Sequence, residues 1–321
     1  MAKVYCSNND QIRKLRSRGM IIEHHTEVKR LIEYGNYFVI INGYKELFID
    51  SSYTGPDEKY KSGTTFKEVY ALYNFDRELR ALFLKNILML ENAVKSIVAR
   101  VFSAKYGHDN YLRITNFETN VAPREKSTPA EKVGNIVKLI STIQSDISQQ
   151  LQKKNPMIVH YQLDHGYIPL WVLVNILTLG TISRFYSFMY QMDQNNMGRK
   201  FGLRPREMHS FLDVLTLFRN TCAHDGRLFN YKTSKRVIKM PIHNALGIPA
   251  GPSGNLLYGQ QDLYAVTIIF KLMLKKKEFN LFFAELDSLI SGLSNELHTI
   301  PIEDVLTAMG FPANWQDVKK R

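Results

Sequence analysis

Residues 70–107 read YALYNFDRELRALFLKNILMLENAVKSIVARVFSAKYG, and this stretch decides the fold class. Its apolar side chains recur at spacings of three and four residues, which is the period of one face of an α-helix. No proline interrupts the stretch, and Gly107 is a residue type that commonly ends a helix. The stretch therefore predicts one long helix with a buried face. The members of that face are Leu79, Leu82, Phe83, Ile87, Leu90, Val94, Ile97, Val98 and Val101.

The same helical period continues on both sides of this stretch, and it predicts an all-α protein. We expect residues 70–321 to form an up-and-down helical bundle, and residues 1–69 to form a small N-terminal lobe closed by a loop at 50–64. The apolar run 37–41 fits either a strand or a packed turn. A stretch rich in proline and glycine predicts a long inserted loop at 228–261. The other expected helices cover residues 11–18, 26–33, 130–154, 170–192, 262–274, 279–293 and 303–309, and one further helix ends near residue 224.

The composition favours a globular protein that meets polyanions. The chain has 321 residues and a formal net charge of +12, so nucleic acid or an acidic membrane surface would each suit its field. Cys6 and Cys222 are the only cysteines, which argues against a disulfide scaffold and a structural zinc site. Residues 1–10 lack the apolar run of a signal peptide, and the most apolar window, 168–182, is too short and too polar to span a bilayer. We expect a cytoplasmic protein that has no membrane partner and needs no cofactor or metal.

The segment 217–227, LFRNTCAHDGR, contains the side chains of this sequence best suited to catalysis. Arginine offers a planar, permanently charged fork for phosphate oxygens, and histidine can take and give a proton near neutral pH. On a helix, Asn220 and His224 share a face, and Arg227 joins them if the last turn persists, while Arg219 lies about one helical step round from Asn220. The segment therefore predicts a site that acts on a phosphodiester. The alternative is that these cations only make surface or capping contacts at a helix C-terminus.

Residues 219–224, RNTCAH, resemble the R-N-x-x-x-H motif of the HEPN ribonucleases, the higher eukaryote and prokaryote nucleotide-binding superfamily. The surrounding chain resembles one branch of that superfamily, the bacterial Abi-like abortive-infection proteins of the AbiD or AbiF type. The order and spread of the shared segments make the resemblance fairly specific. These segments are 18–22, 36–38, 42–44, 73–80, 170–171, 179–186, 219–230 and 309–312, together with Trp315.

The resemblance implies a HEPN-like helical bundle and an RNA-cleaving site. HEPN relatives form composite sites at dimer interfaces and cleave RNA without metal, and some Abi-like relatives are associated with a cognate small non-coding RNA. In this picture His224 is general acid or base, Arg219 clamps the phosphate, Asn220 orients the imidazole or the phosphate, and Arg227 adds charge. RNA, a cognate small RNA and a second copy of the chain are the implied partners.

The sequence thus supports a metal-independent endoribonuclease of abortive-infection or toxin–antitoxin type. The alternative is a non-catalytic RNA-binding module that holds a structured small RNA. On either hypothesis a basic cluster after the motif could contact RNA beside Tyr231, although a charge run that only keeps a loop soluble would look the same. The predicted RNA-binding residues are Arg227, Lys232, Lys235, Arg236 and Lys239.

Other reactive side chains carry weaker hypotheses. Cys222 could be a nucleophile, but it falls on the apolar stripe of the helix that holds the motif, where a buried and inert thiol is the better expectation. His24, His25, His160 and His165 lack an acidic partner at metal-ligand spacing, and scattered surface or loop histidines are the better expectation. Three acids on the 70–106 helix could pair with Arg219 or His224, or could belong to a solvated face or a structural ion pair. These acids are Asp76, Glu78 and Glu91.

Overall fold

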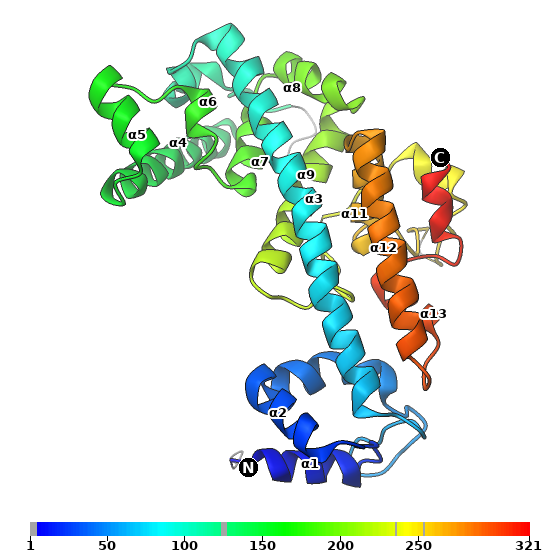
Figure 1. Cartoon of the computed structure of the whole chain (residues 1–321). Coiled ribbons are helices and arrows are strands. Elements are labelled where there is room, and N and C mark those ends of the chain that lie inside the picture. The colour runs from blue at the N-terminus through cyan, green and yellow to red at the C-terminus, as the bar shows by residue number, and fades with distance from the viewer. Residues whose placement is uncertain (1–4, 123–126, 235, 253) are drawn as a thin grey trace.

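The structure is a computed structural model, and it describes residues 5–122, 127–234, 236–252 and 254–321. Over these ranges the protein is all-α, as predicted (Figure 1). Extended pairing in the same ranges is confined to isolated bridges, between Ile21 and Thr65, between Ile49 and Tyr60, and between Ala250 and Leu256. No helix in the described part of the chain is long and apolar enough to cross a membrane.

Helix α3, Phe66–Tyr106, is the predicted long helix and the axis of the molecule. With 41 residues it is about 60 Å long, and Figure 1 shows it running from the N-terminal lobe through the whole body. It begins with a capping box, in which Thr65 Oγ1 accepts from the backbone N–H of Glu68 and the Glu68 carboxylate accepts from that of Thr65. It ends at Gly107, whose φ of +87° suits glycine.

The N-terminal lobe packs on the first turns of α3 (Figure 1). The predicted boundary at residue 69 lies inside α3, so the lobe and the body share one continuous helix. The apolar run at 37–41 forms a turn of π-helix and not a strand. The elements of the lobe are α1 (Asn8–Ser17), α2 (His25–Gly35), η1 (Phe38–Asn42) and η2 (Lys45–Phe48).

The middle of the chain forms one long helix, α4, and several short helices, of which α6, α7 and α8 pack against α3. The single helix expected at 170–192 is wrong, since parts of three helices cover this range, and local hydrogen bonds account for the first break, at 174–178. The Asn175 amide donates to the carbonyls of Trp171 and Val172, and Thr178 then caps a new helix by accepting from Thr181 N at 3.1 Å. The elements here are η3 (Asn110–Leu112), η4 (Ile114–Asn116), α4 (Pro129–Gln152), α5 (Pro156–His160), η5 (Tyr161–His165), α6 (Leu170–Leu173), α7 (Leu179–Phe188), α8 (Gln191–Gly198) and η6 (Arg199–Phe201).

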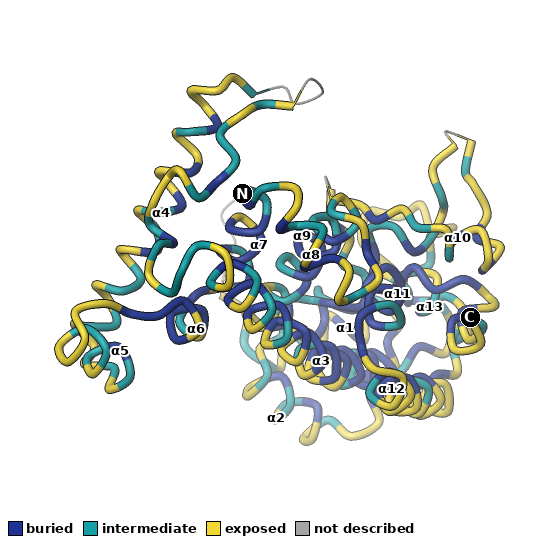
Figure 2. Tube along the Cα trace, turned by 90° about the horizontal axis from the view of Figure 1, so that it is seen from above, coloured by how far each residue is buried: buried dark blue, intermediate teal, exposed yellow. Residues whose placement is uncertain are grey.

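The last third of the chain completes the core against α3. Phe83 of α3, Phe270 of α11 and Phe282 of α12 pack with ring centroids 4.8–5.6 Å apart. Figure 2 shows the buried residues concentrated where these helices meet. The described part of the predicted loop at 228–261 contains one short helix, α10. The elements are α9 (Pro205–Ala223), α10 (Pro241–Ala245), α11 (Leu263–Met273), α12 (Lys276–Glu296), α13 (Ile302–Met309) and η7 (Trp315–Lys319).

Candidate phosphodiester site at the end of helix α9

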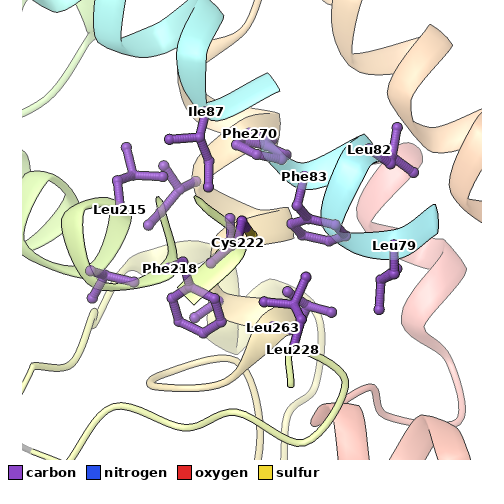
Figure 3. Close-up of a cluster of buried hydrophobic side chains, with 14 of the residues drawn as sticks. Leu79, Leu82, Phe83, Ile87, Leu215, Phe218, Cys222, Leu228, Leu263 and Phe270 are labelled. Atoms are coloured by element: carbon purple, nitrogen blue, oxygen red, sulfur yellow. The ribbon is translucent and has the colours of Figure 1, made fainter. Parts of the chain in front are cut away.

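Helix α9 is fixed against α3 by an apolar stripe. Its buried residues recur at three- and four-residue spacings, as the sequence predicted, and they face the apolar side of α3 (Figure 3). Phe218 is fully buried and Cys222 nearly so. Since this stripe sets the rotation of α9, it also decides in which direction each residue of the motif points. The side chains labelled where the two helices meet are Leu79, Leu82, Phe83 and Ile87 of α3 with Leu215, Phe218 and Cys222 of α9.

Arg219 follows Phe218 and points toward α3. Its Nε lies 3.6 Å from Oε2 of Glu91, and the other oxygen of that carboxylate accepts from Lys95 Nζ at 2.7 Å. Of the three acids of α3 that could pair with Arg219 or His224, Glu91 lies beside Arg219, and it is a deeply buried carboxylate, 4% exposed. The distance slightly exceeds that of a hydrogen bond, and both Glu91 Oε2 and Arg219 Nε have no hydrogen-bond partner among the described residues.

The guanidinium of Arg219 is therefore anchored on one edge and free on the other. Among the described residues, its Nη groups form no hydrogen bond. The Arg219 side chain is 30% exposed, so these groups can reach solvent. Such an arrangement can hold a phosphate oxygen while Glu91 restricts where the guanidinium lies.

Asn220 and His224 lie on the solvent side of α9. Both are exposed, and neither side chain has a hydrogen-bond partner in the described part of the chain. Because each residue of a helix turns by about 100°, His224 lies about 140° around the axis from Arg219. One chain therefore presents the histidine and the anchored arginine on different sides of the same helix.

The position of His224 is set by the way α9 ends. His224 is the last capping residue, and its N–H donates to Asn220 O at 3.0 Å. Asp225 then adopts φ +54°, and Gly226 N donates back to Thr221 O at 2.9 Å, which is the hydrogen bond of a Schellman motif. A Cβ at Gly226 would lie 3.0 Å from that same carbonyl oxygen, so the absence of a side chain lets the backbone of Gly226 approach Thr221 this closely.

A buried polar clamp, which we define as Asp76, Arg80 and Tyr44, holds the segment that follows the motif. Asp76 is fully buried and accepts from Tyr44 Oη and from Arg80 Nη1, each at 2.7 Å. It also accepts from the backbone N–H groups of Leu228 (3.1 Å) and Phe229 (2.6 Å).

The clamp reaches the motif itself through Arg80, whose Nη2 donates to Asp225 at 2.6 Å, directly after His224. Burial, together with the neighbouring Asp76 carboxylate, raises the pKa of Tyr44, which keeps the phenol a donor. For Asp76 this is the structural ion pair that the sequence left open as an alternative, whereas the roles of Tyr44 and Arg80 were not predicted. The available signal was an acid and an arginine four residues apart, next to the apolar face of a long helix.

Arg227 is separated from the other motif residues. Helix α9 stops at Ala223, so the turn that would bring Arg227 beside His224 does not form. Its guanidinium instead donates to the carbonyl of Gly43 in the N-terminal lobe. Arg227 thus links the end of the motif to the lobe, and its charge is half-buried there.

The remaining predicted RNA-binding residues follow the loop back along α9. Lys232 is exposed, and Arg236 Nη1 lies 3.1 Å from Asp213, two turns before the motif. Lys239 lines a groove with residues from the first turns of α9. Lys235 lies outside the described residues. The described basic residues are therefore spread along α9 and do not form one cluster beside His224.

The thiol inside the motif is unsuited to nucleophilic chemistry. Burial, with a contribution from the nearby Asp76 carboxylate, raises the pKa of Cys222 to about 12, so the thiol stays protonated near neutral pH. The expectation of no acidic partner is wrong for His160, because Asp164 lies one helical turn later and its carboxylate is 2.6 Å from His160 Nδ1. Over the described ranges, no three His, Cys, Asp or Glu side chains are grouped so that they could hold a metal ion.

Comparison with known proteins gives one match. No curated protein and no solved structure matches the chain significantly. The sequence profile of the Abi-like proteins matches residues 30–230, which include the lobe from within α2 onward, helix α3, the clamp and the whole motif at the end of α9. Because the match covers well over half of the 321 residues, the chain belongs to the family of Abi-like proteins.

Proposed function

We propose that this protein is a metal-independent endoribonuclease that acts in phage defence by abortive infection or as the toxin of a toxin–antitoxin pair. The defence context rests on membership of the Abi-like family. One observation carries the ribonuclease proposal. The end of α9 presents a histidine without a partner in the described chain, and a Schellman motif and a buried clamp both fix the residues next to His224.

The side chains of Arg219, Asn220 and His224 can supply the groups that RNA cleavage requires. The 2′-hydroxyl of a ribose attacks the adjacent phosphorus, a base accepts the hydroxyl proton, and an acid protonates the departing 5′-oxygen. The products are a 2′,3′-cyclic phosphate and a 5′-hydroxyl. His224 supplies base or acid, Arg219 neutralises charge that develops on the phosphate oxygens, and Asn220 is a neutral donor on the same face as His224.

The proposal includes a second copy of the chain. One histidine cannot readily serve as base and acid at opposite sides of the phosphorus, and within one chain His224 and Arg219 point to different sides of α9. Two copies meeting at the ends of α9 would supply two histidines and two arginines to one composite site. The exposed position of His224 is compatible with such a meeting.

The decisive experiment incubates the purified chain with single-stranded RNA and identifies the ends produced. We expect cleavage in excess EDTA and a terminal 2′,3′-cyclic phosphate. A strict requirement for Mg²⁺, or efficient cleavage of DNA of the same sequence, would overturn the proposal, because DNA lacks the attacking hydroxyl.

A non-catalytic module that holds a structured small RNA is the second candidate. The ion pair between Arg219 and Glu91 favours it, because a guanidinium already matched to a carboxylate is less available to a phosphate. The same assay separates the two candidates. A chain that co-purifies with RNA, binds it tightly and leaves it intact at every protein concentration is a binding module.

A further inference from the structure

A groove of about 730 Å³ lies between the C-terminal half of α3 and helix α6. Its floor includes Lys95, the same residue that bonds to Glu91 beside Arg219. The groove is thus linked to the anchored arginine of the motif through Lys95 and Glu91, and it extends toward the end of α3. The two walls are tied together beyond it, because Leu170 N donates to His108 O at 2.8 Å. The lining residues that the argument uses are Asn92, Lys95, Arg100, Ser103 and Trp171.

The groove offers donors that nothing in the described chain occupies. Arg100 is exposed and makes no ion pair with the described residues. Asn92 is also exposed, and its side chain has no hydrogen-bond partner there. Ser103 Oγ is buried, again without a described partner. The lining contains no carboxylate, and the positive charge of Lys95 is already neutralised by Glu91. Arg100 thus gives the groove a net positive charge.

Exposed aromatic rings continue from the groove across the surface. Trp171 is 53% exposed, which is unusual for so large an apolar side chain. Its ring centroid lies 6.2 Å from that of His108, which lies 4.7 Å from Tyr167, and Tyr167 lies 6.3 Å from His165. We call these four side chains the ring row. They come from two segments, His108 after α3 and the stretch 165–171, and the fold brings His108 to the other three.

A cationic groove that opens onto a row of exposed rings suits an unpaired nucleic acid strand. Unpaired bases stack on aromatic side chains whatever their sequence, while arginine and amide groups follow the backbone. Tryptophan and arginine are also common in protein–protein interfaces, so the test includes an arm for a second copy of the chain. A duplex fits less well, because its bases are already stacked on each other.

We propose that this groove and the ring row bind single-stranded RNA and lead it to Arg219 and His224. Trp171 stacks on an unpaired base, and Arg100 contacts a phosphate. The inference rests on the proposed function, because it names the form of RNA and the path by which it reaches the site. It also assigns binding to residues outside the motif and outside the basic loop.

The test uses the full-length chain carrying His224→Ala, so that RNA is bound but not cleaved. Anisotropy of a fluorescein-labelled, unstructured RNA of about 12 nucleotides gives the Kd. Trp171→Ala should weaken binding about 5-fold to 160-fold, the range measured for losing one base–aromatic stack, and Trp171→Phe should retain most of the affinity. Arg100→Gln should flatten the salt dependence by about 0.7 in logarithmic slope.

Two matched controls make the result specific. Arg77→Gln removes an exposed arginine of the same helix about 35 Å from Arg100, and it should change neither the Kd nor the slope. The chain has two tryptophans, and Trp315 is 5% exposed, so RNA should quench mainly the emission of Trp171. Trp171→Phe should remove that quenching.

The outcomes separate this inference from the proposed function. If Trp171→Ala and Arg100→Gln leave the Kd unchanged while wild-type protein cleaves RNA, the groove does not bind RNA. The ribonuclease proposal would then remain valid. The groove would equally be overturned if Trp171→Ala dissolved an RNA-free dimer in light scattering without weakening RNA binding. If the unsubstituted chain neither binds nor cleaves RNA, the proposed function fails and this inference fails with it.

Discussion

Nε of Arg219 lies 3.6 Å from Oε2 of Glu91, a carboxylate buried in the side of helix α3 and bonded on its other oxygen to Lys95. Glu91 therefore connects the long helix to the motif on α9. It limits the position of the arginine that is proposed to meet phosphate. Through Lys95 it also links the motif to the groove.

Glu91→Gln should destabilise the protein and reduce RNA cleavage. The substitution keeps the shape of the side chain but leaves Lys95, which is 8% exposed, without its counter-charge, and breaking a buried pair costs about 3 kcal/mol or more. Urea unfolding gives the change in the free energy of unfolding. Glu78→Gln, an exposed glutamate on the same helix, is the control and should change it by less than about 0.5 kcal/mol. Equal effects of the two substitutions would refute the role of Glu91.

His224→Ala should lower cleavage at least about 100-fold, because positioned proton transfer contributes that much or more. The free energy of unfolding should change by less than about 0.5 kcal/mol, since the side chain is exposed and has no partner among the described residues. His209→Ala is the matched control on the same helix and should leave cleavage unchanged. A His224→Ala variant that cleaves at the normal rate would remove His224 from the site.

Asp76→Asn should be severely destabilising, by about 3–5 kcal/mol, because it leaves Arg80 without its buried counter-charge. Tyr44→Phe removes one hydrogen bond from the same clamp and should cost about 1 kcal/mol. Thermal or urea unfolding measures both. If the clamp positions the residues after His224, cleavage at a temperature where each variant is folded should fall most in Asp76→Asn and less in Tyr44→Phe.

Cys222 should resist thiol reagents in the native state. Its folded pKa is about 12 against an unfolded value of about 8.5, so the stability linked to the protonated thiol is complete below pH 8.5 and is lost as the pH rises toward 12. Native protein near neutral pH should react quickly at the exposed Cys6 and at Cys222 only on unfolding.

The difference in free energy of unfolding between wild type and Cys222→Ala should also fall by about 1.5 kcal/mol between about pH 8.5 and about pH 10. Rapid modification of two thiols in folded protein would contradict the buried position.

Substitutions in the basic loop should change the salt dependence of RNA binding by different amounts. Lys232 and Lys239 are exposed, whereas Arg236 is paired with Asp213 at 3.1 Å. Reversing the two lysines together should reduce the logarithmic salt slope of RNA binding by about 1.4, at about 0.7 for each phosphate that the chain no longer neutralises. Arg236→Glu should reduce it less. A filter-binding titration across a salt series measures the slopes, and an unchanged slope in the double variant would place RNA elsewhere.

The sequence by itself determined the helices and the rotation of the motif helix. The apolar period of residues 70–106 predicted α3, which begins four residues earlier at Phe66, and the stripe that includes Phe218 and Cys222 placed α9 against it. These features depend on local period and on burial of one face, which are both readable from spacing. The break at 174–178 was missed because it depends on side-chain hydrogen bonds of Asn175 and Thr178, which compete with a continuous helix.

Only the tertiary structure decided which residues meet. Asp76 and Phe229 are separated by 153 residues, and their hydrogen bond exists because α3 and the segment after α9 are packed together. The choice of Glu91 over Asp76 and Glu78 as the partner of Arg219 arises in the same way, and so does the contact of His108 with the rings at 165–171. Such contacts depend on how helices approach each other across the core, and the spacing of residues along one helix does not contain that information.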